Sequence, residues 1–265
     1  MDIFNYNPAT MVSWLLTLLR VSIVMFMLPV FNTNNIPVQV KAAVTLVVTL
    51  AIWPRLSLPG GDVAALHPLT LGLMVLGEAI MGLVLGLAVN FLFMGIQAGG
   101  ELLGFQMGFT MIQFADPLTG NQTGTAAFFL WMVSLLVFLL LDGHLHMIRG
   151  FAASFALVPP GGLLITHTLL DQILTLAAQL FILALKIAAP VMVALFTVEV
   201  ALALVARTSP QIHVMDLGLP VKIAVGFFFV GLLLTILSDH VASFIAGIPG
   251  LFTNLLNSMS PLFAK

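Results

Sequence analysis

The sequence contains no cysteine and very little charge. The absence of cysteine excludes disulfides, thiolate metal sites and cysteine nucleophiles, although it does not identify the compartment. Charged residues make up 7% of the 265 positions, against roughly 25% in an average globular domain. A soluble domain with so little charge would expose too much apolar surface to stay dispersed. We therefore expect a chain that is embedded in a membrane or buried in a large apolar assembly.

The few charges are scattered along the chain and nearly balance. The net charge is -2 and no basic run occurs, so nucleic acid is not expected as a partner. The eight Lys and Arg residues stand singly, which leaves the orientation in a membrane unassigned. Asp2 is the only charge before Arg20, so no basic region precedes the first apolar run. We accordingly expect no cleavable signal peptide.

Motifs for catalysis and metal binding are also missing. None of the six histidines forms an H-E-x-x-H pattern, and His144 and His146 are two positions apart, on different faces of a helix. The chain contains no G-x-S-x-G elbow, no Walker A loop and no dinucleotide-binding fingerprint. We expect no metal, no cofactor and no enzymatic activity.

Long apolar runs account for most of the sequence, of which 61% is hydrophobic. A membrane-spanning helix needs about 20 predominantly apolar residues. The runs predict an all-α protein of long, broken helices and helical hairpins, with about six spans. They cover residues 11–31, 38–53, 69–96, 126–141, 173–206 and 219–237, followed by a shorter run at 241–256 that contains Pro249.

The segment from Gly95 to Gly124 differs most from an ordinary membrane helix. It reads GIQAGGELLGFQMGFTMIQFADPLTGNQTG. Glycines four positions apart leave a bare stripe on a helix, where another backbone can approach closely. We expect close helix packing at four of these positions: Gly99, Gly100, Gly104 and Gly108.

Large apolar side chains fill the second part of this segment. Methionine is flexible and adapts its shape, so a Met- and Phe-rich loop held by tightly packed helices would form a gasket. The same residue types also fit a plain buried packing surface. The glycines before them and the polar turn at 116–121 favour the loop. The residues concerned are Phe105, Met107, Phe109, Met111 and Phe114.

Six charged residues lie within or against the apolar runs: Arg20, Glu78, Glu101, Lys186, Glu199 and Lys222. A charge at a bilayer centre costs at least ~2.5–3.5 kcal/mol, so such groups normally face protein or water. A proton or ion pathway would gather several of them at one depth. Their dispersal favours structural pairing instead.

One pairing follows from spacing along the chain. A hairpin that turns between Pro210 and Gln211 places Glu199 and Lys222 at equal distances from the turn. We expect these two to form an ion pair, either within the hairpin or with a neighbouring subunit. Three other charges are expected to pair between subunits: Glu101, Arg20 and Lys186.

Several sequence stretches together resemble the FliR family of flagellar export proteins. This family is equivalent to the T-type export-gate subunit of virulence type III secretion systems. The central match is the run Gly100–Phe109, GELLGFQMGF, followed by Ala-Asp-Pro at 115–117. Weaker matches lie at 189–191, at 206–212 and at 219–222. Length and hydropathy agree along the whole chain.

The resemblance implies a non-enzymatic subunit of a protein-export gate in the bacterial inner membrane. One copy would join FliP-like and FliQ-like subunits in a closed helical cone at the flagellar basal body, much of it above the membrane plane. Other export-apparatus membrane proteins and membrane lipid would surround this cone, and unfolded flagellar proteins would pass through it.

The same resemblance assigns parts of the chain. Residues 1–158 would form a FliP-like helical portion, and residues 163–265 a FliQ-like helical hairpin with a C-terminal tail. A plug loop near 105–122 would close the channel through its Met and Phe side chains while export is idle.

A secondary transporter for a small solute is the alternative function. Helices broken at Pro190 and at the glycine-rich segment would then form a binding site near the membrane midplane. Such transporters usually have two halves with matching helix breaks, whereas the halves of this sequence differ in length and pattern.

Overall fold

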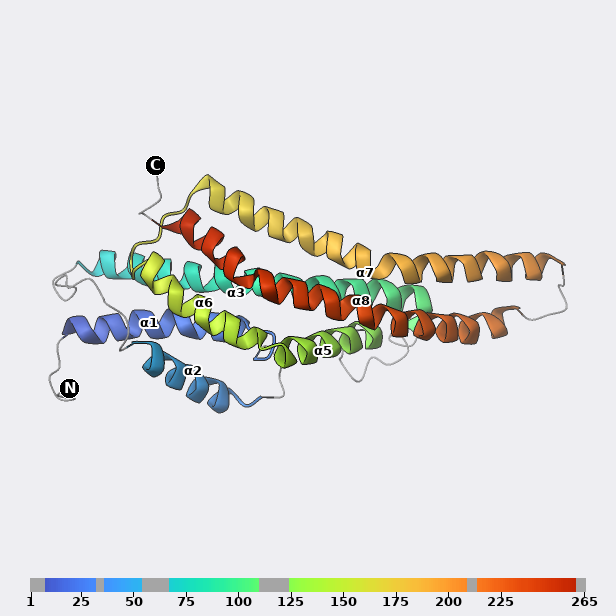
Figure 1. Cartoon of the computed structure of the whole chain (residues 1–265), viewed down its shortest axis with the longest axis horizontal. Helices are drawn as coiled ribbons and strands as arrows, with labels where there is room; N and C mark the ends of the chain where they lie inside the picture. The colour runs from blue at the N-terminus through green and yellow to red at the C-terminus, as the bar shows by residue number, and fades with distance from the viewer. Residues whose placement is uncertain (1–7, 32–35, 54–66, 110–123, 209–213, 261–265) are drawn as a thin grey trace. The chain divides into compact units, whose positions relative to one another are not determined.

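The computed structural model describes residues 8–31, 36–53, 67–109, 124–208 and 214–260. These segments are helical and contain no strand, which confirms the all-α prediction. Figure 1 labels the helices, which are α1 (Pro8–Met27), α2 (Val38–Ile52), α3 (Pro68–Met107), α5 (Thr125–Leu140), α6 (Gly143–Leu157), α7 (His167–Thr208) and α8 (Val214–Met259).

Three of the helices are much longer than one bilayer crossing. α3, α7 and α8 contain 40, 42 and 46 residues, whereas a straight span needs about 20. Within the described segments, α1, α3, α7 and α8 are long and apolar enough to cross a membrane. The interrupted pair α5 and α6 adds a fifth span if it crosses as one unit. The described residues therefore provide four or five of the six expected spans, because α2 has only 15 residues.

Neither Pro190 nor Pro249 ends the helix that contains it. α7 continues through Pro190, and α8 continues through Pro249 and unites the runs at 219–237 and 241–256. A proline removes one backbone N–H and hence one intrahelical hydrogen bond, while the bonds on either side of it remain. Both prolines are exposed, so their rings do not displace a packed neighbour.

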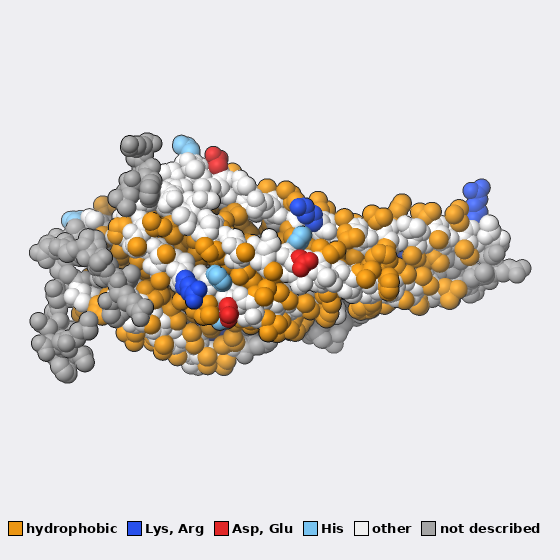
Figure 2. All heavy atoms as spheres, in the orientation of Figure 1, with side chains coloured by type: hydrophobic (Ala, Val, Ile, Leu, Met, Phe, Trp, Pro, Cys, Tyr) orange, Lys and Arg blue, Asp and Glu red, His pale blue; other side chains and the backbone are white. Residues whose placement is uncertain are grey.

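The surface of the helices is strongly apolar. In Figure 2, hydrophobic side chains cover much of the displayed face, and the few charged side chains stand singly among them. On α7 and α8, Phe181, Val193 and Phe228 are each 66–67% exposed. Apolar surface of this extent is covered by lipid or by other proteins in functioning molecules.

The chain divides into two compact units that are not consecutive in sequence. The first comprises residues 1–90, 142–176 and 246–265, and the second comprises residues 91–141 and 177–245. The expected sequence boundary at 158–163 falls inside the first unit. α3, α7 and α8 each contribute to both units.

Close packing at glycine and ring stacking hold the first unit together. A Cβ atom at Gly86 of α3 would lie 2.5 Å from the Cβ of Met27 in α1, so only glycine permits this approach. Phe151 of α6 stacks on Phe252 of α8 with ring centroids 5.5 Å apart. Gly150 makes room for this ring, because its Cβ would lie 2.1 Å from Cδ2 of Phe252.

Candidate functional site

The C-terminal half of α3 lies at the centre of the second unit, and one side of it packs on α7. A Cβ at Gly95 would be 3.0 Å from the carbonyl oxygen of Leu180, and a Cβ at Gly99 would be 3.0 Å from that of Ala184. The two carbonyls are four residues apart, as are the two glycines. One glycine stripe therefore fits one turn of the α7 backbone, as in close-packed membrane helices.

Another glycine of α3, Gly100, allows α5 to approach α3 closely. A Cβ at Gly100 would lie 2.5 Å from the Cα of Ala127, a distance that no side chain tolerates. The next expected contact position, Gly104, is buried but less tight, since its Cβ would be 3.7 Å from the Cβ of Ala126. The demand for glycine is therefore strongest at the earlier position.

The last turn of α3 packs against α8. The side chain of Met107 is 1% exposed and lies over Gly226, where a Cβ would come within 2.6 Å of its terminal methyl carbon. Phe109 lies beside Phe227 with ring centroids 6.0 Å apart. A flexible thioether packed on a bare backbone fills this contact without a void.

Gly108 ends the helix. Its φ of 86° lies in the left-handed region that terminates helices and favours glycine, and its N–H donates to the carbonyl of Phe105 at 3.1 Å. A Cβ at this position would also meet Leu219 of α8 at 2.9 Å. Residues 105–107, the start of the predicted plug loop at 105–122, are helical because α3 continues to Met107, and residues 110–122 lie outside the described residues.

Three of the five apolar residues predicted to form the plug are described, and these three differ in exposure. Phe105 is 70% exposed, whereas Met107, two positions later in the helix, is buried. Phe109 is half-buried. The other two predicted plug residues, Met111 and Phe114, lie outside the described residues.

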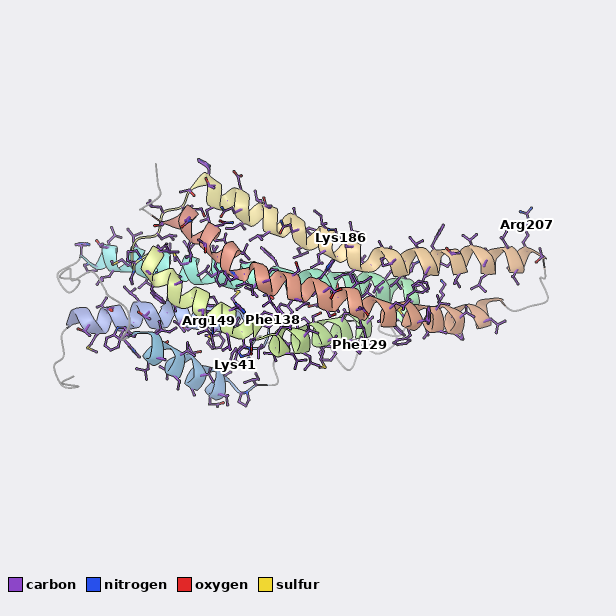
Figure 3. The ribbon with its side chains drawn as sticks, viewed as in Figure 1. Lys41, Phe129, Phe138, Arg149, Lys186 and Arg207 are labelled. Atoms are coloured by element: carbon purple, nitrogen blue, oxygen red, sulfur yellow. The ribbon has the colours of Figure 1, made fainter. Side chains whose placement is uncertain are left out.

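Two of the expected inter-subunit charges are exposed on the second unit. Glu101 on α3 accepts a hydrogen bond from Nε2 of Gln97 at 3.3 Å, within its own helix. Lys186 lies on α7 (Figure 3) and is exposed. Among the described residues, neither of the two charges forms an ion pair.

The structure brings Glu199 and Lys222 together. Nζ of Lys222 on α8 donates a hydrogen bond to Oε1 of Glu199 on α7. The side chain of Glu199 is 37% exposed and that of Lys222 is 25% exposed, so the pair is partly hydrated. It joins the two long helices on either side of the 209–213 connection.

A second ion pair lies deep in the first unit. Nε of Arg20 on α1 donates to Oε2 of Glu78 on α3 at 2.5 Å, and Nη2 donates to Oε1 at 2.9 Å. Both residues are 1% exposed. Removing one partner of such a pair typically costs ~3–5 kcal/mol, because the other charge stays buried and unpaired.

This pair changes the role expected for Arg20. The sequence placed Arg20 among the charges that pair between subunits, whereas the structure buries it and pairs it within the chain. Its partner, Glu78, was visible in the sequence only as a carboxylate inside an apolar run. Two opposite charges inside two such runs were the available signal for their pairing.

The described residues offer no obvious place for a metal ion. No group of three or more His, Asp or Glu side chains comes together in these segments. Nδ1 of His144 is buried without a hydrogen-bond partner, but one imidazole nitrogen does not make a metal site.

Comparison with known proteins gives consistent results along the chain. The chain is 29% identical to the flagellar biosynthetic protein FliR of Pectobacterium carotovorum over 261 residues, which cover 97% of this chain and 98% of the relative. It is 28% identical to FliR of Escherichia coli K12, with coverages of 91% and 92%. It is 30% identical to the surface presentation of antigens protein SpaR of Salmonella typhimurium, with coverages of 77% and 75%.

The match to a family model covers most of the helical chain. The model of the bacterial export proteins, family 1, matches residues 11–248, from α1 into the C-terminal part of α8. The stretch includes both ion pairs and the glycine stripe of α3. The chain belongs to the family of bacterial export proteins, family 1.

Proposed function

We propose that this chain is a non-enzymatic core subunit of a flagellar type III protein-export gate, and that residues 105–122 seal the channel of that gate. Membership in a family of bacterial export proteins supports the export role. The flagellar assignment is supported by relatives named flagellar biosynthetic proteins that match over most of both chains.

The observation that carries the proposal is the close packing of the C-terminal half of α3 against three other helices. This half-helix packs on α7 at Gly99, on α5 at Gly100 and on α8 at Met107. It ends at Gly108, directly before the segment that contains Met111 and Phe114. The proposed plug therefore starts from a helix that three neighbours hold in place.

The physical basis of sealing is the exclusion of water. A constriction lined by apolar side chains loses its water and blocks ions, although nothing covalent closes it. Methionine side chains adapt to chains of different shape, which suits a gate that passes many unfolded substrates. The exposed Phe105 and the residues after Gly108 supply such side chains.

The proposed partners are FliP-like and FliQ-like subunits, together with other membrane proteins of the export apparatus. The exposed apolar faces of α7 and α8 are suited to helix packing against them. Glu101 and Lys186, which have no ion-pair partner among the described residues, would pair with charges of neighbouring subunits.

Residues 1–158 would act as the FliP-like portion and 163–265 as the FliQ-like portion. The assembly would sit at the basal body, largely above the plane of the inner membrane.

Native mass spectrometry tests this assignment. The tagged chain is co-expressed with its candidate FliP-like and FliQ-like partners and extracted in mild detergent. We expect one discrete complex with a single copy of this chain and several copies of each partner. A monomer or symmetric homodimer that leaves the partners behind would contradict the proposal and favour a solute transporter.

A further inference from the structure

The buried ion pair does more than join α1 to α3. Nη1 of Arg20 also donates to the carbonyl oxygen of Val158 at 3.1 Å, and Oε1 of Glu78 accepts a hydrogen bond from the N–H of Gly161 at 3.1 Å. Each partner of the pair thus contacts the backbone of the connection between α6 and α7. Hydrogen bonds to ionised groups are stronger than those between neutral groups.

The connection itself is a preformed turn. The N–H of Gly162 donates to the carbonyl of Pro159 at 2.9 Å, and Gly161 has φ 80°. Proline at the second position and a glycine of positive φ at the third are the signature of a type II turn. A Cβ at Gly161 would also lie 2.4 Å from Cε of Met74 on α3. The turn therefore needs glycine for its shape, and the side chain of Met74 lies close against this position.

Each side-chain nitrogen and oxygen of the pair has a hydrogen-bond partner within this network. Nη1 of Arg20 also donates to Oγ of Ser154 at 3.3 Å, and the guanidinium carbon lies 4.2 Å from the ring centroid of Phe155. The remaining guanidinium nitrogens are bound to Glu78. Such closed hydrogen bonding suits a structural role better than a path for ions or protons, which needs groups that can exchange partners.

The far end of the connection is fastened to the end of α8. Oγ1 of Thr166 donates a hydrogen bond to the carbonyl of Ser258 at 2.8 Å. The same oxygen accepts a hydrogen bond from the N–H of Leu169 at 3.2 Å, and this second bond caps the N-terminus of α7. The N–H of Leu164 donates to the carbonyl of Met259 at 3.0 Å. The connection is thus bound to the Arg20–Glu78 pair near its start and to the last turn of α8 near its end, within the first unit.

We infer that Arg20 and Glu78 act as one lock that positions the α6–α7 connection on α3. Both are positioning residues, because they act through the backbone of the turn at 158–162. This role is separate from the proposed sealing of a channel and stands whether or not the chain builds an export gate.

Disulfide cross-linking measures the position of the turn directly. A Cβ at Gly77, next to Glu78, would lie 3.6 Å from the Cβ of Leu163, just after the turn. Disulfides form at Cβ separations of about 3.5–4.5 Å. The double variant Gly77→Cys/Leu163→Cys should therefore link when the full chain is oxidised in membranes. Because the native sequence has no cysteine, no other thiol competes.

The yield of the 77–163 cross-link is compared between the native background and the variant Arg20→Met/Glu78→Met. This change removes both buried charges together, so no unpaired charge remains to unfold the unit. It also removes both hydrogen bonds to the turn. We expect most of the cross-link between positions 77 and 163 to be lost. A yield equal to that in the native background would overturn the lock.

A matched cysteine pair in the second unit controls for general unfolding. The variant Gly104→Cys/Ala126→Cys has a Cβ separation of 3.7 Å and should link in both backgrounds.

If the double methionine background loses this control link too, both cysteine pairs are measured in the background Arg20→Lys instead. Lysine keeps a positive charge but lacks the planar fork that holds Glu78 and Val158 together. Loss of the 77–163 link alone would then support the lock. Retention of both links, or loss of both, would overturn it.

Discussion

The ammonium of Lys222 on α8 contacts the carboxylate of Glu199 on α7, 23 positions earlier in the chain. The two side chains remain 25% and 37% exposed, so water and salt compete with the pair. Partly exposed pairs of this kind specify which turns of two helices lie opposite each other more than they stabilise the fold.

Removing this pair should therefore cost little. We expect Lys222→Met to lower the free energy of unfolding of the isolated chain by ~0.2–1 kcal/mol, measured by thermal melting in detergent. The exchange Glu199→Lys/Lys222→Glu should recover most of that loss. A destabilisation of several kcal/mol in the single variant would contradict a partly hydrated pair.

The buried pair should behave in the opposite way. We expect Arg20→Met to destabilise the chain by ~3–5 kcal/mol, because the Glu78 carboxylate is left buried without its partner. The double variant Arg20→Met/Glu78→Met should be clearly more stable than either single variant. Melting temperatures of all three variants, measured in one detergent, test this order. Additive losses in the double variant would count against direct coupling.

Two neighbouring glycines on α3 should respond differently to alanine. Gly100→Ala would place a methyl group 2.5 Å from the Cα of Ala127, and overpacking of this kind costs ~1–3 kcal/mol. Gly104→Ala, on the same helix, has room at 3.7 Å and should be neutral or stabilising through helix propensity. Melting temperature and recovery with partner subunits give the comparison. Equal behaviour of the two variants would argue against the close approach at Gly100.

Loss of the proposed plug should make the membrane leak. We expect deletion of residues 110–119 to raise ion conductance while leaving assembly intact, because the apolar side chains that exclude water are removed. The smaller change Met111→Ala/Phe114→Ala should act in the same direction.

The control for this experiment is Leu140→Ala. Leu140 is apolar and 81% exposed at the end of α5, so its truncation removes similar surface away from the proposed plug. Conductance of assembled complexes in planar bilayers is the measurement. Unchanged conductance in the deletion would refute the sealing role.

Much of the fold follows from local sequence signals. Apolar runs predicted an all-helical protein, and spacing about Pro210 predicted that Glu199 and Lys222 lie at one level. Both inferences depend only on residues near each other in sequence or symmetric about one turn. The glycine stripe predicted close packing, but only the structure separates the tight position at Gly100 from the looser one at Gly104.

Other features depend on contacts that no local pattern encodes. Arg20 and Glu78 are 58 positions apart, and their pairing requires knowing that α1 lies on α3. The continuity of α8 through Pro249 was missed because proline inside a helix is costly and local propensity marks it as a stop, whereas the structure shows one helix of 46 residues. The turn at 158–162 was seen as a separator, whereas its backbone is bound to the buried pair.

The passage of α3, α7 and α8 through both compact units affects how the protein can be made and divided. Neither unit corresponds to a contiguous fragment, so no single cut of the chain separates one unit from the other. The first unit is complete only after residues 246–265 have been synthesised, long after its segments at 1–90 and 142–176. The earlier segments of the first unit therefore lack part of their packing surface until α8 is complete. Chaperones or partner subunits that bind during translation would bind this incomplete unit.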